Sequence, residues 1–506
     1  MTKVLELNSI TKRFGSLTAN DDITLTLDQG EILALLGENG AGKTTLMNIL
    51  FGHYTADAGN VRVFGVDLPS GIPRAAIQAG VGMVHQHFTL ADNLTVLENV
   101  MLGSEPLTLM RSARSEAREK LMQIADRFGL PVTPDAKIST LSVGERQRVE
   151  ILKALYRDAR VLILDEPTAV LARPEATRLF ETLRDMTHQG LSIIFISHKL
   201  HEVMAASDRV AVLRGGKMVA ERTTSQTSPA ELAELMVGRK VERPLRQEHR
   251  IGAPMLVAEK IRVEEDGEAR LDDVSFTVNA GEILGIVGVS GNGQAALGAL
   301  LSGLVTPVAG QLTLAGESVG HLGPRGLIHA GAGRVPEDRH AQGVVGELTL
   351  WENAILERLR TSEFSTKGFV RKNAGKSYAA KLIDRFDIRG ANPDTRIRLL
   401  SGGNMQKLIL GRVLSNDPRF VLANQPTRGL DEGAIAAVHT ELLAARAKGA
   451  AILLISEELE EAVALSDRIQ AIVNGRLSEP ISAEAADPQR LGLMMAGVWT
   501  GDENAA

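Results

Sequence analysis

One short loop constrains the fold of this chain more than any other stretch. It lies between the apolar run Ile32–Leu36 and the helical pattern Leu46–Leu50, which predicts a strand, a loop and a helix in an α/β domain. Glycines let backbone N–H groups approach a polyphosphate, a lysine reaches the terminal phosphates, and a hydroxyl side chain suits Mg²⁺. The positive N-terminus of the following helix favours the same anion. The loop that fits this pattern consists of Gly37, Glu38, Asn39, Gly40, Ala41, Gly42, Lys43, Thr44 and Thr45.

The motifs of the first half recur in the second half, 251 residues on at first and 259 residues on later. A repeat of this length indicates two copies of one domain. We expect domains over residues 1–240 and 254–500, joined by the polar linker 241–253, and a disordered tail at 500–506. The recurring pairs are Gly30-Glu31 with Gly281-Glu282, Gly37 with Gly288, Leu141-Ser142 with Leu400-Ser401, Pro167-Thr168 with Pro426-Thr427, Ser197 with Ser456, and Asp208-Arg209 with Asp467-Arg468.

Length and composition bound the class of protein. At 506 residues the chain is too long for one ordinary core. It has no cysteine, which excludes disulfide frameworks and thiolate metal sites. The net charge of −6 gives no electrostatic case for a nucleic-acid partner. No apolar run approaches the roughly 18 to 20 residues that span a bilayer, so we expect attachment to a membrane only through other proteins.

Polar residues follow short apolar runs in the first copy. These are Asp165-Glu166, His198 and Gln86. Carboxylate and amide oxygens suit Mg²⁺, and a carboxylate is a candidate general base. Taken singly, Asp165-Glu166 could be a helix N-cap, His198 a surface histidine and Phe14 a core residue. Their order along the chain, together with the loop, favours a functional interpretation.

With the segment Leu141-Ser-Val-Gly144, these features resemble a known family. Each half is similar to the nucleotide-binding domain of ATP-binding cassette (ABC) transporters, and the resemblance covers nearly the whole chain. It implies an α/β fold class: two tandem ABC-type P-loop nucleotide-binding domains, each with a RecA-like α/β core, an antiparallel β subdomain and a helical subdomain. It also implies ATP as the nucleotide, Mg²⁺ as the metal and ATP hydrolysis as the activity.

The resemblance implies a role for each residue of the first copy. Glu166 is the base for the attacking water, His198 contacts the γ-phosphate, and Phe14 stacks on adenine. Mg²⁺ is held by Thr44, by Gln86, which also counts among the catalytic residues, and through water by Asp165. In the family two domains pack head to tail, so the LSGG segment of one completes the ATP site of the other. From the second copy, the first site would then take Ser401, Gly402, Gly403 and Asp431.

The second copy departs from the family pattern at the residues that carry the chemistry. Its loop lacks the lysine and the threonine, and its carboxylate pair, histidine and glutamine are replaced. Loss of the general base alone is expected to lower the rate of hydrolysis by about 10² to 10⁴-fold. We therefore expect one hydrolytic site built from intact parts and one degenerate site built from altered parts. The altered residues are Gln294, Ala295, Glu337, Asn424, Gln425 and Glu457 in the second copy, with Val143 and Ala172 in the first.

Tandem cassettes without membrane spans resemble the ATP-binding subunits of importers for nucleosides and for simple sugars. The segments 82–88 and 143–153 are closer in sequence to the nucleoside group, whereas the segment Pro336–Arg339 is shared with sugar importers. The resemblance implies two membrane permease subunits, a separate extracytoplasmic solute-binding protein and a place on the cytoplasmic face of the cell membrane. The alternatives are a soluble tandem ABC ATPase of ribosomes or DNA repair, and a nucleotide-regulated module without turnover. The short linker and the missing cysteines oppose the former, and the presence of Glu166 and His198 opposes the latter.

Overall fold

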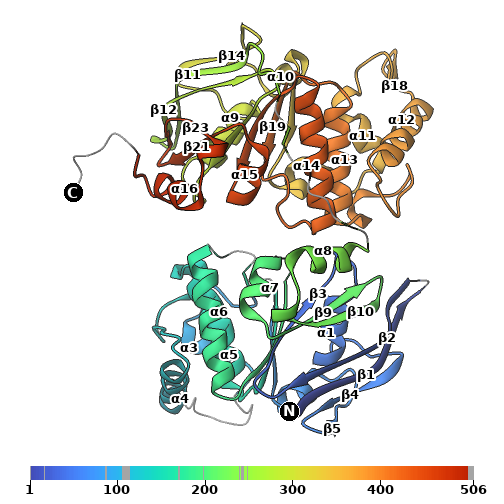
Figure 1. Ribbon diagram of the computed structural model, residues 1–506, viewed down its shortest axis with the longest axis vertical. Helices are drawn as coiled ribbons and strands as arrows, with labels where there is room; N and C mark the ends of the chain where they lie inside the picture. Colours follow the sequence, from blue (N-terminus) through green and yellow to red (C-terminus); the bar gives the residue numbers. More distant parts are fainter. Residues whose placement is uncertain are drawn as a thin grey trace. The chain divides into compact units, whose positions relative to one another are not determined.

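The computed structural model describes residues 2–499 except 16, 86–87, 105–113, 169–170, 172, 198, 239, 241–243, 245 and 248. The chain forms two compact units, Met1–Val241 and Glu242–Ala506, which we call unit 1 and unit 2. In each unit, helices lie beside β-sheets, as Figure 1 shows. The predicted α/β class is confirmed in both units.

An antiparallel sheet forms one layer of unit 1. Its strands are ordered β2-β1-β4-β5. Strand β2 alternates in burial, because Ile23, Leu25 and Leu27 are buried and the residues between them are not. The bounds are β1 (Lys3–Phe14), β2 (Leu17–Asp28), β4 (Ala58–Val63) and β5 (Val66–Asp67).

The second sheet of unit 1 positions the phosphate loop. Its order is β10-β9-β3-β8-β7-β6, and all neighbours are parallel except β10 with β9. Strands β3, β7 and β8 are buried along their whole length, which explains their continuous apolar sequences. Because these three strands are adjacent and parallel, the residues that follow them meet at one edge. The bounds are β3 (Ile32–Leu36), β6 (Val81–Val84), β7 (Val161–Asp165), β8 (Ser192–Ile196), β9 (Arg209–Arg214) and β10 (Lys217–Thr223).

Several helices of unit 1 begin at residues that cap them. Thr95 caps α3 and Ser142 caps α5, each in a capping box with a glutamate. Ser228 caps α8, whose first residue is a proline. The bounds are α1 (Lys43–Phe51), α2 (Pro73–Gln78), α3 (Val96–Met101), α4 (Arg114–Arg127), α5 (Val143–Tyr156), α6 (Arg173–His188), α7 (Leu200–Ala206) and α8 (Pro229–Val237).

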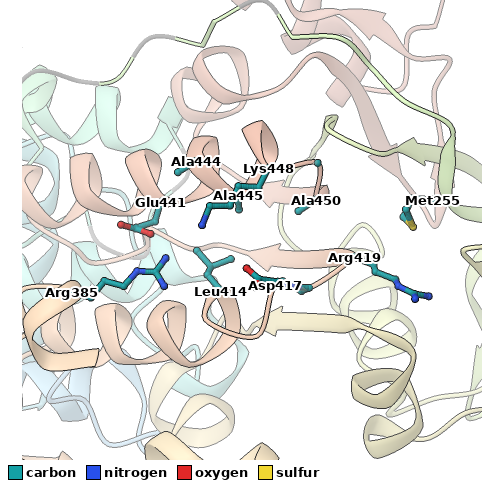
Figure 2. A pocket seen from close by; sticks show the side chains of 12 residues that line it. Met255, Arg385, Leu414, Asp417, Arg419, Glu441, Ala444, Ala445, Lys448 and Ala450 are labelled. Carbon is teal, nitrogen blue, oxygen red and sulfur yellow. The ribbon is translucent and has the colours of Figure 1, made fainter. Parts of the chain in front are cut away.

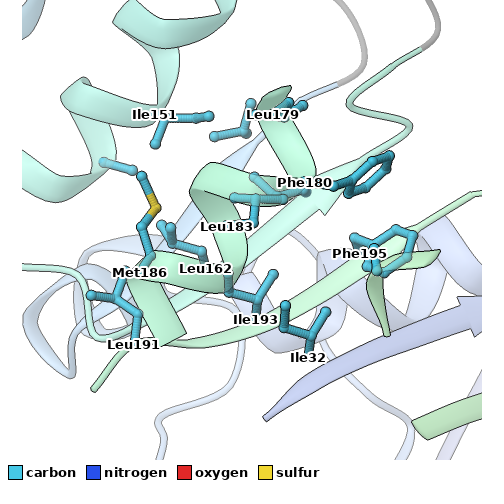
Figure 3. Packing of buried hydrophobic residues seen from close by; sticks show 14 of the residues in the cluster. Ile32, Ile151, Leu162, Leu179, Phe180, Leu183, Met186, Leu191, Ile193 and Phe195 are labelled. Carbon is cyan, nitrogen blue, oxygen red and sulfur yellow. The ribbon is translucent and has the colours of Figure 1, made fainter. Parts of the chain in front are cut away.

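A large part of the core of unit 1 lies between the parallel sheet and helices α5 and α6. Phe195 of β8 is fully buried, and the centre of its ring lies 5.6 Å from that of Phe180 in α6. Figure 3 shows both rings near Leu183 of the same helix. The continuous apolar sequence of β8, which shows no alternation, therefore includes the side chain that contacts α6.

Phe195→Ala is expected to destabilise unit 1 by about 3 to 5 kcal/mol, because truncating a fully buried ring loses its transfer free energy and leaves a cavity. Phe369→Ala is the control, since that ring is 80% exposed and its loss should change stability by less than about 0.5 kcal/mol. Denaturant unfolding of both variants measures the difference. Similar effects from the two substitutions would contradict this packing.

Unit 2 repeats the two sheets of unit 1. Its antiparallel sheet has the order β12-β11-β14-β15, and its larger sheet has the order β16-β19-β20-β13-β21-β22, with β23 paired to β21. Strands β13, β19 and β20 are buried throughout, and they too are parallel neighbours. The bounds are β11 (Pro254–Glu265), β12 (Glu268–Asn279), β13 (Ile283–Val287), β14 (Ala309–Leu314), β15 (Glu317–Ser318), β16 (Ala332–Val335), β17 (Ser365–Thr366), β18 (Phe369–Val370), β19 (Phe420–Asn424), β20 (Ala451–Ser456), β21 (Arg468–Val473), β22 (Arg476–Leu477) and β23 (Ile481–Ser482).

The helices of unit 2 follow the same order as those of unit 1. Figure 1 shows α13 and α14 side by side. The segment that follows the strand β16 contains one π-helical turn, Arg339–Gly343. The bounds are α9 (Gln294–Leu301), α10 (Pro324–Ala330), α11 (Leu350–Ile355), α12 (Lys372–Arg385), α13 (Gly402–Leu414), α14 (Glu432–Ala447), α15 (Leu459–Leu465) and α16 (Pro488–Met495).

Residues 246 and 247 of the predicted linker 241–253 are hydrogen-bonded to the rest of unit 2. Arg246 donates a hydrogen bond to the Ser466 carbonyl at 2.6 Å, and the buried Arg446 donates to the Gln247 carbonyl at 2.9 Å. A buried guanidinium needs acceptors for its five N–H groups, and the linker backbone supplies one. The predicted tail 500–506 lies outside the described residues. None of the described helices combines the length and the apolarity that crossing a membrane requires.

Candidate nucleotide site

The loop between β3 and α1 forms a narrow turn that its own lysine closes. Gly42 has a φ of +99°, and a Cβ there would lie 2.3 Å from a carbonyl oxygen of β2, so only glycine fits. Lys43 is 7% exposed, and its ammonium donates to the carbonyl oxygens of Gly37 at 2.6 Å and Glu38 at 3.0 Å. The Thr44 side chain is exposed in the first turn of α1. The loop thus offers a cation, backbone N–H groups and a hydroxyl in one place.

Two carboxylates follow β7 at the same edge of the sheet. Asp165 ends the strand, pairs with Ile196 of β8 and is 8% exposed. Glu166 has a φ of +47°, and its N–H donates to the Ile196 carbonyl at 3.0 Å. A left-handed residue other than glycine costs about 1 to 3 kcal/mol and persists only where its surroundings enforce it. The backbone therefore holds Glu166 in a strained turn directly after the strand.

The surroundings of Asp165 raise the pKa of its carboxyl group. Its pKa is raised to about 6, first by burial and then by the charge of Glu166, while the Lys43 ammonium opposes the rise. The structure thus brings Lys43, Asp165 and Glu166 close together, as predicted. In the described part of the chain, the Asp165 carboxylate has no hydrogen bond or ion pair. A buried carboxylate without a partner fits a site that binds a cation.

Asp165→Asn is expected to stabilise unit 1 by about 2 to 3 kcal/mol at pH 7.5 without Mg²⁺. The folded-state pKa lies above the unfolded value, so the stability of the wild type falls as the pH rises from 4 through 6. The amide removes this loss, and its advantage should shrink as the pH is lowered toward 4. Thermal unfolding in EDTA across this range measures the effect. Asn424→Asp, the mirror change in unit 2, should be destabilising at pH 7.5, and a pH-independent gain from Asp165→Asn would contradict the assigned cause.

An exposed pair of aromatic rings lies at the end of β1. Phe14 is 43% exposed, and its ring contacts that of Tyr54 edge to face at 5.5 Å. The Lys12 ammonium lies 5.4 Å from the centre of the Phe14 ring. Sequence analysis missed Tyr54, because nothing in its spacing connects it to Phe14. An exposed aromatic face of this kind can stack on a nucleobase.

Three residues singled out from the sequence, Gln86, His198 and Ala172, lie outside the described residues, and their roles stay predictions. Sequence analysis also missed Glu202, which is 3% exposed and lies four residues after His198. Glu202 accepts hydrogen bonds from the hydroxyls of Thr168 at 2.6 Å and Ser197 at 2.9 Å. It therefore ties the segment after β7 to the segment after β8.

The residues of the second copy that were predicted to complete the first site lie at helix starts within unit 2. Ser401 caps α13 by accepting the Asn404 N–H at 3.4 Å. Asp431 caps α14 by accepting the Ala434 N–H at 2.9 Å. Gly402 and Gly403 form the first turn of α13.

Two of the altered residues of unit 2, Asn424 and Gln425, occupy the same backbone positions as Asp165 and Glu166 in unit 1. Asn424 ends β19, and Gln425 follows with a φ of +48° and donates its N–H to the Ile455 carbonyl at 2.8 Å. Glu337 forms an ion pair with Arg428. Unit 2 therefore keeps the geometry of the carboxylate turn and lacks its carboxylates.

Comparison with known proteins identifies the family. The model of the ABC transporter family matches residues 20–169 and again residues 271–428. The chain is 44% identical to the guanosine import ATP-binding protein NupO of Bacillus subtilis over 98% of both chains. The chain belongs to the ABC transporter family. This ABC protein is also 43% identical to the nucleoside import ATP-binding protein NupA of Lactococcus lactis, over 98% of both chains, and 44% identical to the glucose import ATP-binding protein TsgD13 of Haloferax volcanii, over 97% of this chain and 96% of that one.

The tandem ABC architecture also occurs in a solved structure. The complex of archaeal ribosomal stalk protein aP1 and archaeal ribosome recycling factor aABCE1 matches 97% of this chain and 92% of that chain with a TM-score of 0.64. At 18% identity this likeness concerns the fold alone. The two predicted ABC nucleotide-binding domains are confirmed, and this ABC ATPase couples ATP hydrolysis to the import of a small solute.

A pocket of about 290 Å³ lies elsewhere in unit 2 of the ABC ATPase. Its lining includes residues just before β19 and β20, at the opposite strand ends from Asn424, and residues of α13 and α14. Figure 2 shows the charged side chains of Arg385, Glu441 and Lys448 around it. Its lining includes Ala445, and unit 1 has the larger, fully buried Met186 at the matching position. The pocket is no part of the nucleotide site.

Proposed function

We propose that this ABC ATPase energises the import of nucleosides. The observation that carries the proposal is its full-length similarity to the guanosine import protein NupO, and the nucleoside import protein NupA is almost as similar. Import of a simple sugar is the second candidate, because the glucose import protein TsgD13 is equally similar. The solute itself contacts the permeases and a binding protein in this scheme, not this chain.

In this proposal ATP is bound by residues 37–45, and Phe14 stacks on adenine. Glu166 accepts a proton from the attacking water, while His198 contacts the γ-phosphate. The proposal is supported by the shared sheet edge at which the loop and the carboxylates meet. It is supported also by the exposed face of the Phe14 ring.

Mg²⁺ would be held by Thr44, Gln86 and, through water, Asp165. A single carboxylate with neutral oxygens and waters is a ligand set that Mg²⁺ accepts. Among the described residues there is no cluster of three or more histidine, cysteine, aspartate or glutamate side chains that suits a metal. When bound, the ion neutralises charge on the phosphates. The Asp165 carboxylate supports its assignment, because it is buried and has no hydrogen bond or ion pair among the described residues.

The proposal includes contacts from the second copy. Ser401, Gly402, Gly403 and Asp431 would complete the ATP site of residues 37–45, and the altered residues would form a second position that does not hydrolyse. Support comes from the distribution of the substitutions between the two sites. The residues that match the family pattern all belong to the first site, and the altered residues all belong to the second. ATP binding would then draw the two copies together, and hydrolysis would release them.

Membrane attachment is proposed to depend on two different permease subunits at the cytoplasmic face of the cell membrane, which act with a separate extracytoplasmic binding protein. In the family, permeases dock near the segments that follow Gln86 and its counterpart Glu337. These segments differ in sequence, since residues 87–93 and 339–345 share no pattern. Purification of the tagged chain from detergent-solubilised membranes tests this point. Recovery of no membrane protein, or of one permease alone, would overturn it.

Transport by the reconstituted complex tests the choice of solute. Vesicles that contain the permeases, the binding protein and this chain should accumulate labelled guanosine when ATP is supplied on the side of the ATPase, and should not accumulate labelled glucose. The Lys43→Ala chain is the control and should support no uptake. Uptake of glucose without guanosine would replace the nucleoside proposal with the sugar one.

A further inference from the structure

The phosphate loop of unit 2 is filled by its own glutamine. Gln294 is 9% exposed and stands where unit 1 has Lys43. Its amide nitrogen donates to the Val289 carbonyl at 2.9 Å, as Lys43 does to the carbonyl of Glu38. Its amide oxygen accepts the Asn292 N–H at 3.0 Å. A backbone N–H that a phosphate oxygen would need is therefore already bonded within the loop.

Asn292 cross-links the same loop to a neighbouring turn. Its amide oxygen accepts the Asn474 N–H at 2.9 Å, and its amide nitrogen donates to the Val289 carbonyl at 2.9 Å. Its backbone carbonyl accepts the Gly475 N–H at 2.8 Å. Unit 1 has Ala41 at this position, so only the backbone bond has a counterpart, from Gly216 at 3.2 Å. The loop of unit 2 is thus held closed by side chains that the loop of unit 1 lacks.

In the LSGG-like segment of unit 1, the polar groups of Ser142 are also bonded to a nearby side chain. The Ser142 hydroxyl and the Ser142 N–H each donate to the Glu145 carboxylate at 2.8 Å. The bond from the Ser142 N–H, and to a smaller extent the bond from its hydroxyl, lowers the pKa of Glu145 below its ordinary range. A negative charge therefore stays at the start of α5. A γ-phosphate brought to this helix would meet that charge instead of a free hydroxyl proton.

Unit 2 shows the contrast at the matching helix. Asn404 stands in place of Glu145, and it exchanges two hydrogen bonds of 3.1 Å with the backbone of Arg389. Among the described residues the Ser401 hydroxyl only accepts a bond, from the Asn404 N–H. Its proton is therefore left for an oxygen of a ligand. The loop of unit 2 therefore differs from that of unit 1 by the bonds of Gln294 and Asn292, and the Ser142 segment differs from the Ser401 segment by the carboxylate of Glu145.

We propose that this chain binds a single nucleotide, at residues 37–45, because Gln294 in unit 2 and Glu145 in unit 1 close the two elements that would hold a second one. The inference rests on the proposed function, in which each ATP needs one phosphate loop and one LSGG segment. It adds that the second position is not merely without hydrolysis but without ligand. Gln294 and Glu145 are then the residues that determine how many nucleotides the chain takes.

Equilibrium dialysis of the full chain against a labelled β,γ-imido analogue of ATP with Mg²⁺ tests the stoichiometry. The wild type is expected to saturate near one analogue per chain, and Lys43→Ala should lower occupancy at the same concentration at least tenfold. Saturation near two, or one analogue retained by Lys43→Ala, would overturn the single-nucleotide inference. Absence of binding by the wild type would instead overturn the proposed function, so the two failures are distinguishable.

A second set of variants tests the residues themselves. In the Lys43→Ala chain, Gln294→Lys with Ala295→Thr should raise analogue occupancy at least fivefold, whereas Ala295→Thr alone should leave it unchanged. Adding Glu145→Gln to the restored chain should tighten binding at least threefold, since the amide carries no charge. No gain from Gln294→Lys with Ala295→Thr would contradict the role of Gln294, and no gain from Glu145→Gln would contradict that of Glu145. Thermal unfolding of each variant confirms that the chains compared are folded.

Discussion

Glu166→Gln is expected to leave ATP affinity within about threefold of the wild type and to lower turnover by at least about 10²-fold. The amide keeps the size and the hydrogen bonds of the side chain but cannot accept a proton from water, and general-base catalysis contributes about 10² to 10⁴ in rate. The effect should appear in kcat rather than in KM. Steady-state hydrolysis and binding of labelled ATP by the same preparation measure both quantities.

Gln425→Glu is the matched control for this substitution. Gln425 occupies the same left-handed turn in unit 2, but no intact phosphate loop or metal carboxylate accompanies it. The control should therefore leave turnover within about twofold of the wild type. If Glu166→Gln retained more than a tenth of the activity, the assignment of the base would be wrong.

Ser401→Arg is expected to lower ATP hydrolysis by at least about 10²-fold, whereas Ser142→Arg should leave it within about twofold. In the proposed site, the first turn of α13 directs backbone N–H groups and the Ser401 hydroxyl at the γ-phosphate. A long cationic side chain at Ser401 blocks that approach. Ser142 already donates its hydroxyl to Glu145, so the same change there removes no contact with nucleotide.

The comparison of these two variants separates one-site from two-site models. Both serines are N-caps, so both substitutions remove a cap and cost about 1 kcal/mol of stability. The loss of a cap therefore cancels in the comparison, and the difference in hydrolysis reports the asymmetry. Equal loss of activity in the two variants would contradict the one-site model.

The elements that position the nucleotide site were predictable because their signals are local. The strands that precede Gly37 and Glu166 are continuous apolar runs, and a buried parallel strand needs no alternation. The loop itself is specified by glycine spacing and a single lysine. The repeat then predicted the second copy without further information.

The missed features are those in which side chains meet across the fold. Tyr54 contacts Phe14, and Glu202 binds Thr168, across distances in sequence that no motif spans. The bonds of Arg246 to unit 2 could not be foreseen either, since a polar segment has the same composition whether it is free or bound. Glu145 was overlooked for a different reason: a glutamate at the third position of a helix is an ordinary capping residue.

The shared left-handed turn at Glu166 and Gln425 has a consequence for protein engineering. Both residues have nearly the same φ, +47° and +48°, and both donate their N–H to the strand alongside. The main chain of unit 2 is therefore already bent as a carboxylate at that place requires. A designer who wants a chain that cleaves two ATP molecules per cycle can leave the backbone of this turn untouched and work only on side chains, beginning with Asn424→Asp and Gln425→Glu.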